Sequence, residues 1–265
     1  MDPRPEDEMA DYVGSGLLEG RRAVVTGGDS GIGRAVAIAF AKEGADVVIS
    51  YLDEHDDAAR TSQLIEAEGR RCETIAGDLS REDECERLIT ATVDALGGLD
   101  LVVNNLATQA PQESLLDITS EQWDLTFRTN VYSFFWVTRA ALPHLHRGSS
   151  IINTASINGL RGNRSLIDYS ATKGAILAFT YSMAQSLLDD GIRVNCVAPG
   201  PVWTPLIPAT MPASKVEGFG QQAPMGRAAQ PDEIAPSYVF FAAGRLSSYY
   251  SGEVLAPIGG ETLPG

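Results

Sequence analysis

The chain is short of cysteine and has no long apolar run, and these shortages exclude several classes of protein. Among its 265 residues the three cysteines, Cys72, Cys85 and Cys196, are too few and too scattered for a disulfide framework or a metal knuckle. No run of about 18 apolar residues occurs, so no membrane-spanning helix is expected. Unpaired thiols suit a reducing compartment, and the sequence therefore predicts a cytoplasmic protein.

Basic residues are also scarce relative to acidic ones. Lysine and arginine total 20 against 35 aspartates and glutamates, which gives a formal net charge of −15. An acidic protein repels phosphate backbones and anionic lipid, so neither a nucleic acid nor a membrane surface is an expected partner. Residues 1–20 are especially acidic and lack both the basic start and the apolar centre of a secretory signal. We therefore predict an acidic N-terminal tail over residues 1–20 and one domain over residues 21–265.

From residue 21 onward, apolar runs of strand length alternate with helical patterns. Several runs are continuous in valine, isoleucine and leucine, as expected for parallel strands that helices cover on both faces. The predicted strands are Arg22–Thr26, Asp46–Tyr51, Cys72–Ala76, Leu99–Asn104, Ser150–Thr154, Arg193–Ala198 and Glu253–Pro257, and the predicted helices span residues 31–44, 54–69, 80–97, 119–146, 168–189 and 231–243. This alternation predicts a single α/β domain with a doubly wound, seven-stranded parallel sheet and helices on both faces.

A glycine-rich turn separates the first predicted strand from the first predicted helix. Its glycines Gly27, Gly31 and Gly33 carry no Cβ atom, so the backbone can approach a diphosphate whose charge rests on the helix N-terminus. A glycine cluster alone would fit an ordinary tight turn equally well. Its position directly after the first strand and before a helix favours a dinucleotide-binding turn.

Tyr169 and Lys173 lie four residues apart, so their side chains share one face of the predicted helix 168–189. A nearby ammonium favours the phenolate, and Lys173 is therefore expected to lower the pKa of the Tyr169 phenol. Such a phenol can exchange a proton with a substrate oxygen while a hydride moves to or from a nicotinamide. The alternative is an amphipathic helix that happens to carry one aromatic and one basic residue.

Two further polar residues lie where a functional role competes with a structural one. Ser156 follows a central predicted strand at the edge where open α/β sheets bind ligands, although it could simply cap a helix. Asn130 lies inside a predicted helix, where asparagine is unfavourable unless its side chain bonds locally. Both residues are candidates for the site that contains Tyr169.

Taken together, these motifs resemble the short-chain dehydrogenase/reductase family over about residues 20–260. The resemblance rests on the order and spacing of residues 26–33, 104–107, 128–131, 156, 169–173 and 199–204. It implies a Rossmann-type fold, NAD or NADP as the cofactor, and an oxidoreductase that interconverts an alcohol and a carbonyl. It also implies a catalytic tetrad in which Tyr169 is the acid–base, Ser156 orients the substrate, Lys173 contacts the ribose and Asn130 anchors a proton-relay water.

The same resemblance implies a set of cofactor contacts. Asp78 would bond the adenine amino group, although it could instead cap the helix 80–97, and Thr204 would bond the nicotinamide carboxamide. Asn104 would shape the site from its strand end, or else make an ordinary strand-end hydrogen bond. The full set comprises Gly27, Asp29, Ser30, Gly31, Ile32, Gly33, Tyr51, Asp78, Leu79, Asn105, Ala107, Tyr169, Lys173, Pro199, Gly200, Val202 and Thr204.

The end of the second predicted strand bears on the choice of cofactor. Family members that use NAD usually carry an acid at the place of Tyr51, and those that use NADP usually carry a basic residue there or in the glycine turn. This chain has neither, but Asp53 could accept a hydrogen bond from the ribose of NAD, a bond worth roughly 1.5–3 kcal/mol. We therefore expect Asp53 to bind the cofactor and NAD to be modestly preferred.

Two other functions stay open. A reductase of activated double bonds is related chemistry in the same superfamily, although that class tends to space its tyrosine and lysine more widely. A catalytically silent cofactor sensor would be expected to have lost Tyr169 or Lys173.

Helices 119–146 and 168–189 carry apolar residues on more than one face, and together with the family resemblance this predicts a homotetramer.

Overall fold

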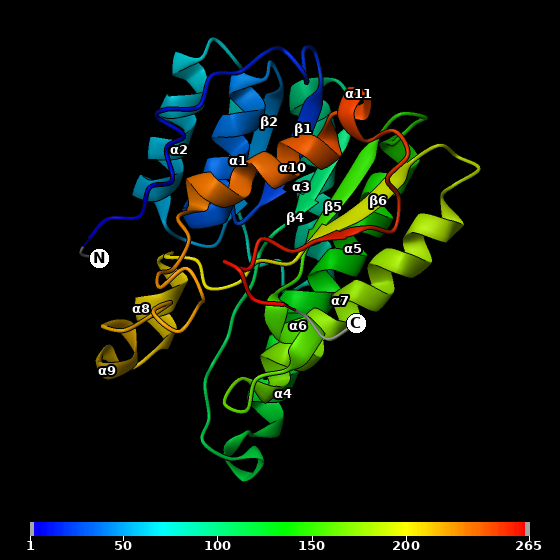
Figure 1. Ribbon diagram of the computed structural model, residues 1–265. Helices are drawn as coiled ribbons and strands as arrows, with labels where there is room; N and C mark the ends of the chain where they lie inside the picture. The colour runs from blue at the N-terminus through cyan, green and yellow to red at the C-terminus, as the bar shows by residue number, and fades with distance from the viewer. Residues whose placement is uncertain (1–2, 263–265) are drawn as a thin grey trace.

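Seven parallel strands pair in the order β3-β2-β1-β4-β5-β6-β7 in the computed structural model, which describes residues 3–262 apart from the side chains of residues 214 and 215 (Figure 1). The chain starts at the centre of the sheet, winds outward to β3, and returns to the centre to build the other half. The strands are β1 (Arg22–Thr26), β2 (Asp46–Tyr51), β3 (Cys72–Ala76), β4 (Leu101–Asn104), β5 (Ser150–Thr154), β6 (Arg193–Val197) and β7 (Val254–Leu255). The predicted doubly wound Rossmann fold is confirmed.

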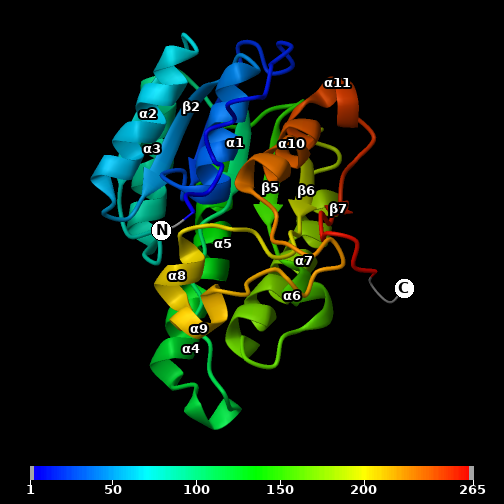
Figure 2. The same ribbon diagram turned by 60° about the vertical axis from the view of Figure 1, so that its left-hand side comes forward.

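Helices cover both faces of this sheet (Figures 1 and 2). On one face α1 (Gly31–Lys42), α2 (His55–Ala67) and α10 (Pro231–Ala242) enclose one apolar core. On the other face α3 (Glu82–Leu96), α5 (Ser133–Ala141) and α7 (Ile167–Ser186) enclose a second. Burying a valine, leucine or isoleucine contributes roughly 1.5–3 kcal/mol, which explains why the central strands are almost wholly apolar. None of the helices within residues 3–262 is long and apolar enough to cross a membrane.

The short helices gather at one end of the sheet. They are α4 (Ser120–Phe127), α6 (Ile157–Arg161), α8 (Leu206–Thr210) and α9 (Ala213–Val216), which lie below the sheet in both ribbon views, while α11 (Gly244–Ser247) follows α10 at the opposite end (Figures 1 and 2). Sequence periodicity did not predict α6, α8, α9 or α11, because four or five residues are too few to show a helical repeat. Residues of α4, α6 and α8 form part of the wall of the cavity at the strand ends.

The predicted helix 119–146 is interrupted. After α4 the chain widens into a π-helical turn, η2 (Arg128–Tyr132), continues as α5, and ends in a 3-10 turn, η3 (Leu142–His144). Pro143 lies in this last turn, where its missing N–H and fixed φ end the α-helical pattern. The π turn contains Asn130, and π turns inside α-helices are frequent at functional sites. The remaining short 3-10 turn is η1 (Leu115–Asp117).

Residues 3–20, here called the N-terminal segment, pack against the domain rather than extend from it. Met9 and Leu18 are buried in the core beneath α1. The Glu43 carboxylate, just past α1, accepts hydrogen bonds from the backbone N–H of Ser15 and of Leu17, both at 2.9 Å. Both ribbon views show the segment running beside α1 (Figures 1 and 2). Its acidity suggested a tail, but its apolar residues and its backbone donors find partners on α1.

If the N-terminal segment folds with the domain, removing a side chain that it buries should destabilise the whole chain. Leu18→Ala is expected to lower the free energy of unfolding by about 2–5 kcal/mol, because Leu18 is 1% exposed and leaves a cavity. Val13→Ala, at a side chain 87% exposed, should change it by less than about 0.5 kcal/mol. Urea unfolding of both variants measures the difference, and equal values would mean that the segment contributes nothing to domain stability.

Candidate active site

A cavity of about 1110 Å³ lies at the carboxyl ends of the strands. In open α/β sheets this edge is the usual place for ligands, because the strand order reverses there and leaves a crevice. The walls come from distant parts of the chain: the turn after β1, the ends of β2 to β5, the N-terminus of α7 and the segment of residues 199–223. A cavity of this size can enclose a dinucleotide together with a small substrate.

The glycine turn after β1 forms the floor of one end of the cavity. Gly27 and Gly31 have φ values of +63° and +54°, in the left-handed region that favours glycine. A Cβ atom on Gly33 would lie 1.8 Å from the carbonyl oxygen of Gly27, so only glycine allows α1 to start so close to β1. The Asn105 side-chain amide donates to the carbonyls of Thr26 and Gly27 at 3.2 and 3.3 Å. These contacts hold the turn open toward the cavity.

The residues present fit a bound dinucleotide. The turn is a cradle that side chains on its glycines would fill, and it leads into the N-terminus of α1, where a diphosphate is favoured. Ser50, which also lines the cavity, has a buried hydroxyl with no hydrogen-bond partner among the described residues. Predicted cofactor residues that line the cavity are Gly27, Asp29, Ser30, Gly31, Ile32, Tyr51, Asp78, Leu79, Asn105, Ala107, Tyr169, Lys173, Pro199, Gly200, Val202 and Thr204.

Two predicted cofactor residues lie outside this lining. Gly33 is buried behind the turn, where it permits the close packing just described. Asp53 is exposed and is not part of the cavity wall, although its neighbours Leu52 and Glu54 are, so its contact with the ribose stays a prediction. Asp29 is a further acidic residue of the lining.

Ser156 and Tyr169 meet at the opposite end of the cavity. Ser156 Oγ accepts a hydrogen bond from the backbone N–H of Asn158 at 3.1 Å, so it caps α6 as well as lining the cavity. Tyr169, on α7, is 9% exposed. Burial raises the pKa of its phenol to about 12, while a hydrogen bond with Ser156 acts in the opposite direction. The helix cap considered for Ser156 is therefore present, and its position in the lining leaves its proposed role toward a substrate open.

Lys173 is buried one helical turn beyond Tyr169. Its Nζ donates to the carbonyl oxygen of Thr154 at 2.8 Å and lies 5.5 Å from the centre of the Tyr169 ring. Burial lowers the pKa of the Lys173 amine to about 7. The expected lowering of the pKa of Tyr169 by Lys173 is not found, because desolvation disfavours the charged forms of both groups.

Asn130 projects from the π turn but does not line the cavity. Its side-chain oxygen accepts from the Thr108 N–H at 2.7 Å, and its amide donates to the Thr108 carbonyl at 2.9 Å and to Thr172 Oγ1 at 3.1 Å. The side chain therefore fastens the loop after β4, which carries lining residues such as Ala107, to the helix that carries Tyr169 and Lys173. The bonding expected for Asn130 within its helix is not what the structure shows, because its partners lie 22 and 42 positions away in the chain.

Asp78 and Asn104 lie at or near the cavity, and both also make hydrogen bonds within the fold. Asp78 lines the cavity and accepts from the Ser80 N–H at 3.0 Å, which makes a local turn, while α3 itself starts at Glu82. Asn104 is fully buried below the cavity and donates to Thr138 and Asn153. The strand-end hydrogen bond considered for Asn104 is therefore present.

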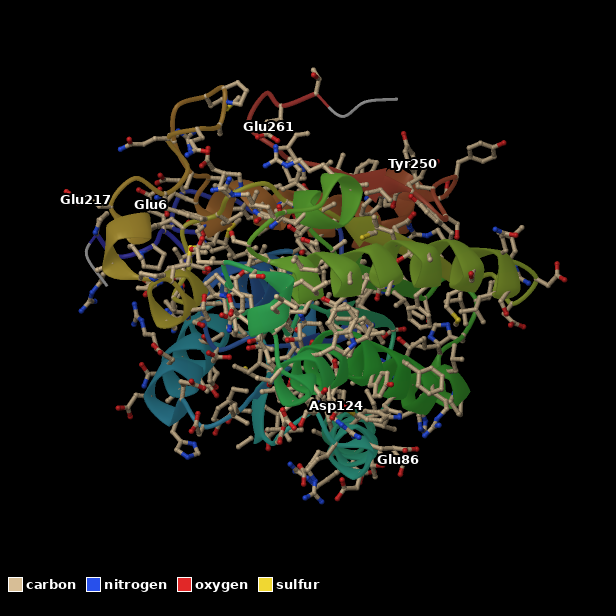
Figure 3. The ribbon with its side chains drawn as sticks, turned by 90° about the horizontal axis from the view of Figure 1, so that it is seen from below. Glu6, Glu86, Asp124, Glu217, Tyr250 and Glu261 are labelled. Carbon is tan, nitrogen blue, oxygen red and sulfur yellow. The ribbon has the colours of Figure 1, made fainter. Side chains whose placement is uncertain are left out.

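Several residues of the cavity carried no recognisable signal in the sequence. The Thr154 carbonyl that anchors Lys173 is backbone, and no motif marks it. Arg161 of α6 pairs with Glu261 at 2.5 Å across a hundred residues, and both line the cavity. Figure 3 views the molecule from below and labels Glu261 at this end, with Glu217 beside α9 on another side of the molecule. Only the fold brings such pairs together.

Comparison with known proteins places the chain among oxidoreductases. A family model described as enoyl-(acyl carrier protein) reductase matches residues 27–262. The uncharacterized oxidoreductase YhdF of Bacillus subtilis (strain 168) is 57% identical over 99% of this chain and 91% of its own. The chloroplastic NADPH-dependent aldehyde reductase 1 of Arabidopsis thaliana is 47% identical over 99% and 93%. The glucose and ribitol dehydrogenase of Daucus carota is 46% identical over 100% and 93%.

A solved structure agrees with these relatives. A short-chain dehydrogenase from Burkholderia cenocepacia J2315, crystallised in complex with NADP, superposes with a TM-score of 0.86 at 32% identity. The match covers 92% of this chain and 98% of that one. A shared fold at this identity, the match of the family model and the motifs at the cavity all lead to one conclusion. The chain is an oxidoreductase of the short-chain dehydrogenase/reductase family.

Proposed function

We propose that this protein interconverts an alcohol and a carbonyl by NAD(P)-dependent hydride transfer, with Tyr169 as the acid–base. The observation that supports this most strongly is the grouping of Ser156, Tyr169 and Lys173 on one wall of the cavity that also contains the glycine turn. When bound, the nicotinamide of the cofactor would supply or accept the hydride. The residues of the chain that would hold the cofactor are those of the glycine turn, the strand ends and residues 199–204 that line the cavity.

Each of the three side chains has a separate task in the proposed reaction. Ser156 Oγ accepts from the Asn158 N–H and forms a hydrogen bond with Tyr169, and its hydroxyl would turn from Tyr169 to donate to a bound substrate oxygen. Tyr169, neutral at pH 7 with a pKa of about 12, is a proton donor to the alkoxide that forms from a carbonyl, because an alkoxide is a far stronger base than a phenolate. Lys173, anchored by Thr154, would hold the ribose of the bound cofactor with its amine.

The proposed cofactor of this chain is NAD or NADP. The expected preference for NAD depended on Asp53, which the structure places outside the cavity lining. The Arabidopsis relative is named as NADPH-dependent, and the Burkholderia structure contains NADP. Neither observation supports a preference for NAD.

The proposed substrate is a small alcohol or aldehyde that carries further hydroxyl groups. Gln109, Asn158 and Asn163 line the cavity with uncharged hydrogen-bonding groups, and Arg161 is compensated by Glu261. A compensated arginine favours a neutral hydroxylated ligand over an anionic one, because Glu261 would repel an added carboxylate. The names of the Arabidopsis and carrot relatives, an aldehyde reductase and a glucose and ribitol dehydrogenase, support the same class.

The description of the matching family model favours one alternative, reduction of an activated double bond. Turnover of a panel of aldehydes, ketones, polyols and enoyl thioesters, each with NADH and NADPH or their oxidised forms, separates the two reactions. A catalytically silent sensor would bind the cofactor and turn over none of them.

The three free cysteines, two of them buried, support the proposed cytoplasmic location.

Replacing Tyr169 by phenylalanine should abolish most turnover. Tyr169→Phe removes only the hydroxyl, and the loss of a positioned acid–base is expected to lower the rate by roughly a hundredfold or more. Cofactor binding, measured by fluorescence titration, should persist. Tyr181→Phe, on the same helix but 42% exposed and outside the cavity, is the matched control. Activity of Tyr169→Phe within about threefold of the wild type would remove Tyr169 from the mechanism.

The buried amine of Lys173 should impose a measurable pH dependence on stability. Its folded pKa of about 7 lies below the ordinary value near 10.4, so the unfolded chain binds a proton that the folded chain releases. The stability of the wild type should therefore rise with pH from about 7 toward 10, and at pH 7 the burial costs on the order of 4 kcal/mol.

Lys173→Met removes this cost. At pH 7 the variant is expected to be more stable than the wild type in urea unfolding, despite the lost bond to Thr154, and to be inactive. Its advantage should shrink by about 2 kcal/mol at pH 9, because the wild type gains stability over that interval. Lys42→Met, at a lysine paired with Glu68 outside the cavity, is the matched control. An advantage that does not change with pH would contradict the low pKa of Lys173.

We also propose that the chain forms a homotetramer. Helices α4, α5 and α7 and the turn between the first two present large apolar side chains to solvent: Leu125, Tyr132, Phe135 and Tyr181 are all at least 42% exposed. Apolar faces of this kind usually bury themselves in a partner.

Light scattering should therefore give about four times the chain mass of 28.3 kDa at micromolar concentration. Phe135→Glu is expected to shift the protein to a smaller species, because a charge at a buried contact has no partner. Val13→Glu, at a side chain 87% exposed and outside these helices, should not. A monomeric wild type would contradict the tetramer, and a tetrameric Phe135→Glu would exclude this face from its interfaces.

A further inference from the structure

The N-terminal segment places one buried carboxylate on the glycine turn. Asp7 is 3% exposed, and its Oδ2 accepts a hydrogen bond from the backbone N–H of Gly31 at 2.9 Å. Both carboxylate oxygens also accept from Arg34 Nη1, at 3.3 and 3.4 Å. Burial raises the pKa of Asp7, while Arg34 and the Gly31 N–H act against this shift. An acid is therefore kept in a buried position by a specific set of partners.

The first turn of α1 has no other cap of its own. The N-cap Ser30 makes no side-chain cap hydrogen bond, and the first turn contains no acidic residue. The N–H groups at the start of a helix need acceptors, and a carboxylate is favoured there by the helix dipole. Asp7, which is 24 positions earlier in the chain, supplies the acceptor for Gly31.

Arg34 extends this contact to the other side of the turn. Besides pairing with Asp7, its Nε donates to the carbonyl of Asp29 at 2.9 Å, and its Nη2 donates to Asp57 at 3.0 Å. The pair of Asp7 and Arg34 therefore fixes the turn at two backbone positions, Asp29 and Gly31, from the side away from the cavity. Asn105 fixes the same turn at Thr26 and Gly27.

The segment also contacts Trp203, next to Thr204, which lies beside Gly31 of the turn. The Pro3 carbonyl accepts from Trp203 Nε1 at 2.9 Å, and the Trp203 ring lies 6.4 Å from that of Phe219, a lining residue. Glu6 accepts from the backbone N–H of Asp232 at 3.1 Å. Figure 3 shows Glu6 on the same side of the molecule as Glu217 and the short helices beside it. One short segment thus joins the glycine turn to residues 203–219.

We propose that the N-terminal segment is a positioning element of the cofactor site, and that Asp7 is the positioning residue that holds the glycine turn in its binding conformation. This rests on the proposed function only in that the ligand is NAD(P). A turn rich in glycine has many accessible conformations, and fixing it before binding removes an ordering cost from the affinity. The segment precedes residues 27–262, which the family model matches, so the motifs of the model do not include Asp7.

The test compares the affinity for cofactor in full-length variants without substrate. Asp7→Ala should raise the Kd for NADPH and NADH, measured by fluorescence titration, about tenfold. The KM for the cofactor should rise by a similar factor, while kcat at saturating cofactor stays within about twofold. Glu8→Ala is the matched control, because its carboxylate pairs with Arg60 at the surface and does not touch the turn. It should leave the Kd unchanged.

A second variant separates positioning from folding. Asp7→Asn keeps an oxygen that can accept from Gly31 but loses the charge that pairs with Arg34, so its Kd should lie between those of the wild type and Asp7→Ala. If Asp7→Ala does not fold, the Kd of Asp7→Asn is compared with that of the wild type instead. An unchanged Kd in the folded variants, even with a lower Tm, would show that Asp7 is merely structural and would overturn the inference. A wild type that binds neither cofactor would overturn the proposed function as well.

Discussion

The hydrogen bond from Lys173 to the carbonyl of Thr154 is the contact on which the proposed chemistry depends. It joins α7 to the end of β5, two residues before Ser156, and so sets the catalytic helix against the sheet at a fixed position. An amine this deeply buried is costly, as its lowered pKa shows, and a single backbone acceptor with two aromatic rings nearby offsets only part of that cost. A buried lysine that no ion pair neutralises among the described residues is more readily explained by function than by stability.

Polar contacts, rather than apolar packing, connect the parts of the site to one another. The apolar cores lie on the two faces of the sheet, whereas the carboxyl edge is held by buried amides and hydroxyls. Asn105 links the end of β4 to the glycine turn, and Asn130 links the following loop to α7. Such contacts have strict geometry and are costly to leave unsatisfied, so they fix side-chain positions that apolar packing would leave adjustable.

The N-terminal segment adds a second layer to this arrangement. The family model matches the chain only from the glycine turn onward, but the turn is held from behind by Asp7 and Arg34. The acidity that suggested a separate tail has a different explanation at this position. One of its carboxylates meets the N-terminus of α1, and another, Glu8, meets Arg60 of α2. An acidic segment is thus attracted by the positive N-terminus of α1 and by an arginine side chain of α2.

The sequence by itself determined the sheet, its helices and the identity of the central site residues. Continuous apolar runs and their alternation with helices carry that information locally, and the spacing of Tyr169 and Lys173 puts them on one helical face. What only the tertiary structure decided was which distant groups meet. Asp53 is absent from the wall of the cavity, whereas Asp29 and Glu54 are part of it.

The same division holds for protonation and for the N-terminal segment. The sequence predicted that Lys173 would lower the pKa of Tyr169, since proximity was all it could show. Burial depends on everything packed around a group, and it raises the pKa of Tyr169 and lowers that of Lys173. Likewise, the contact of Asp7 with Gly31 joins residues whose spacing follows no repeat, so no local pattern could predict it. Periodicity and motifs determine elements, whereas desolvation and long-range contacts exist only once the chain has folded.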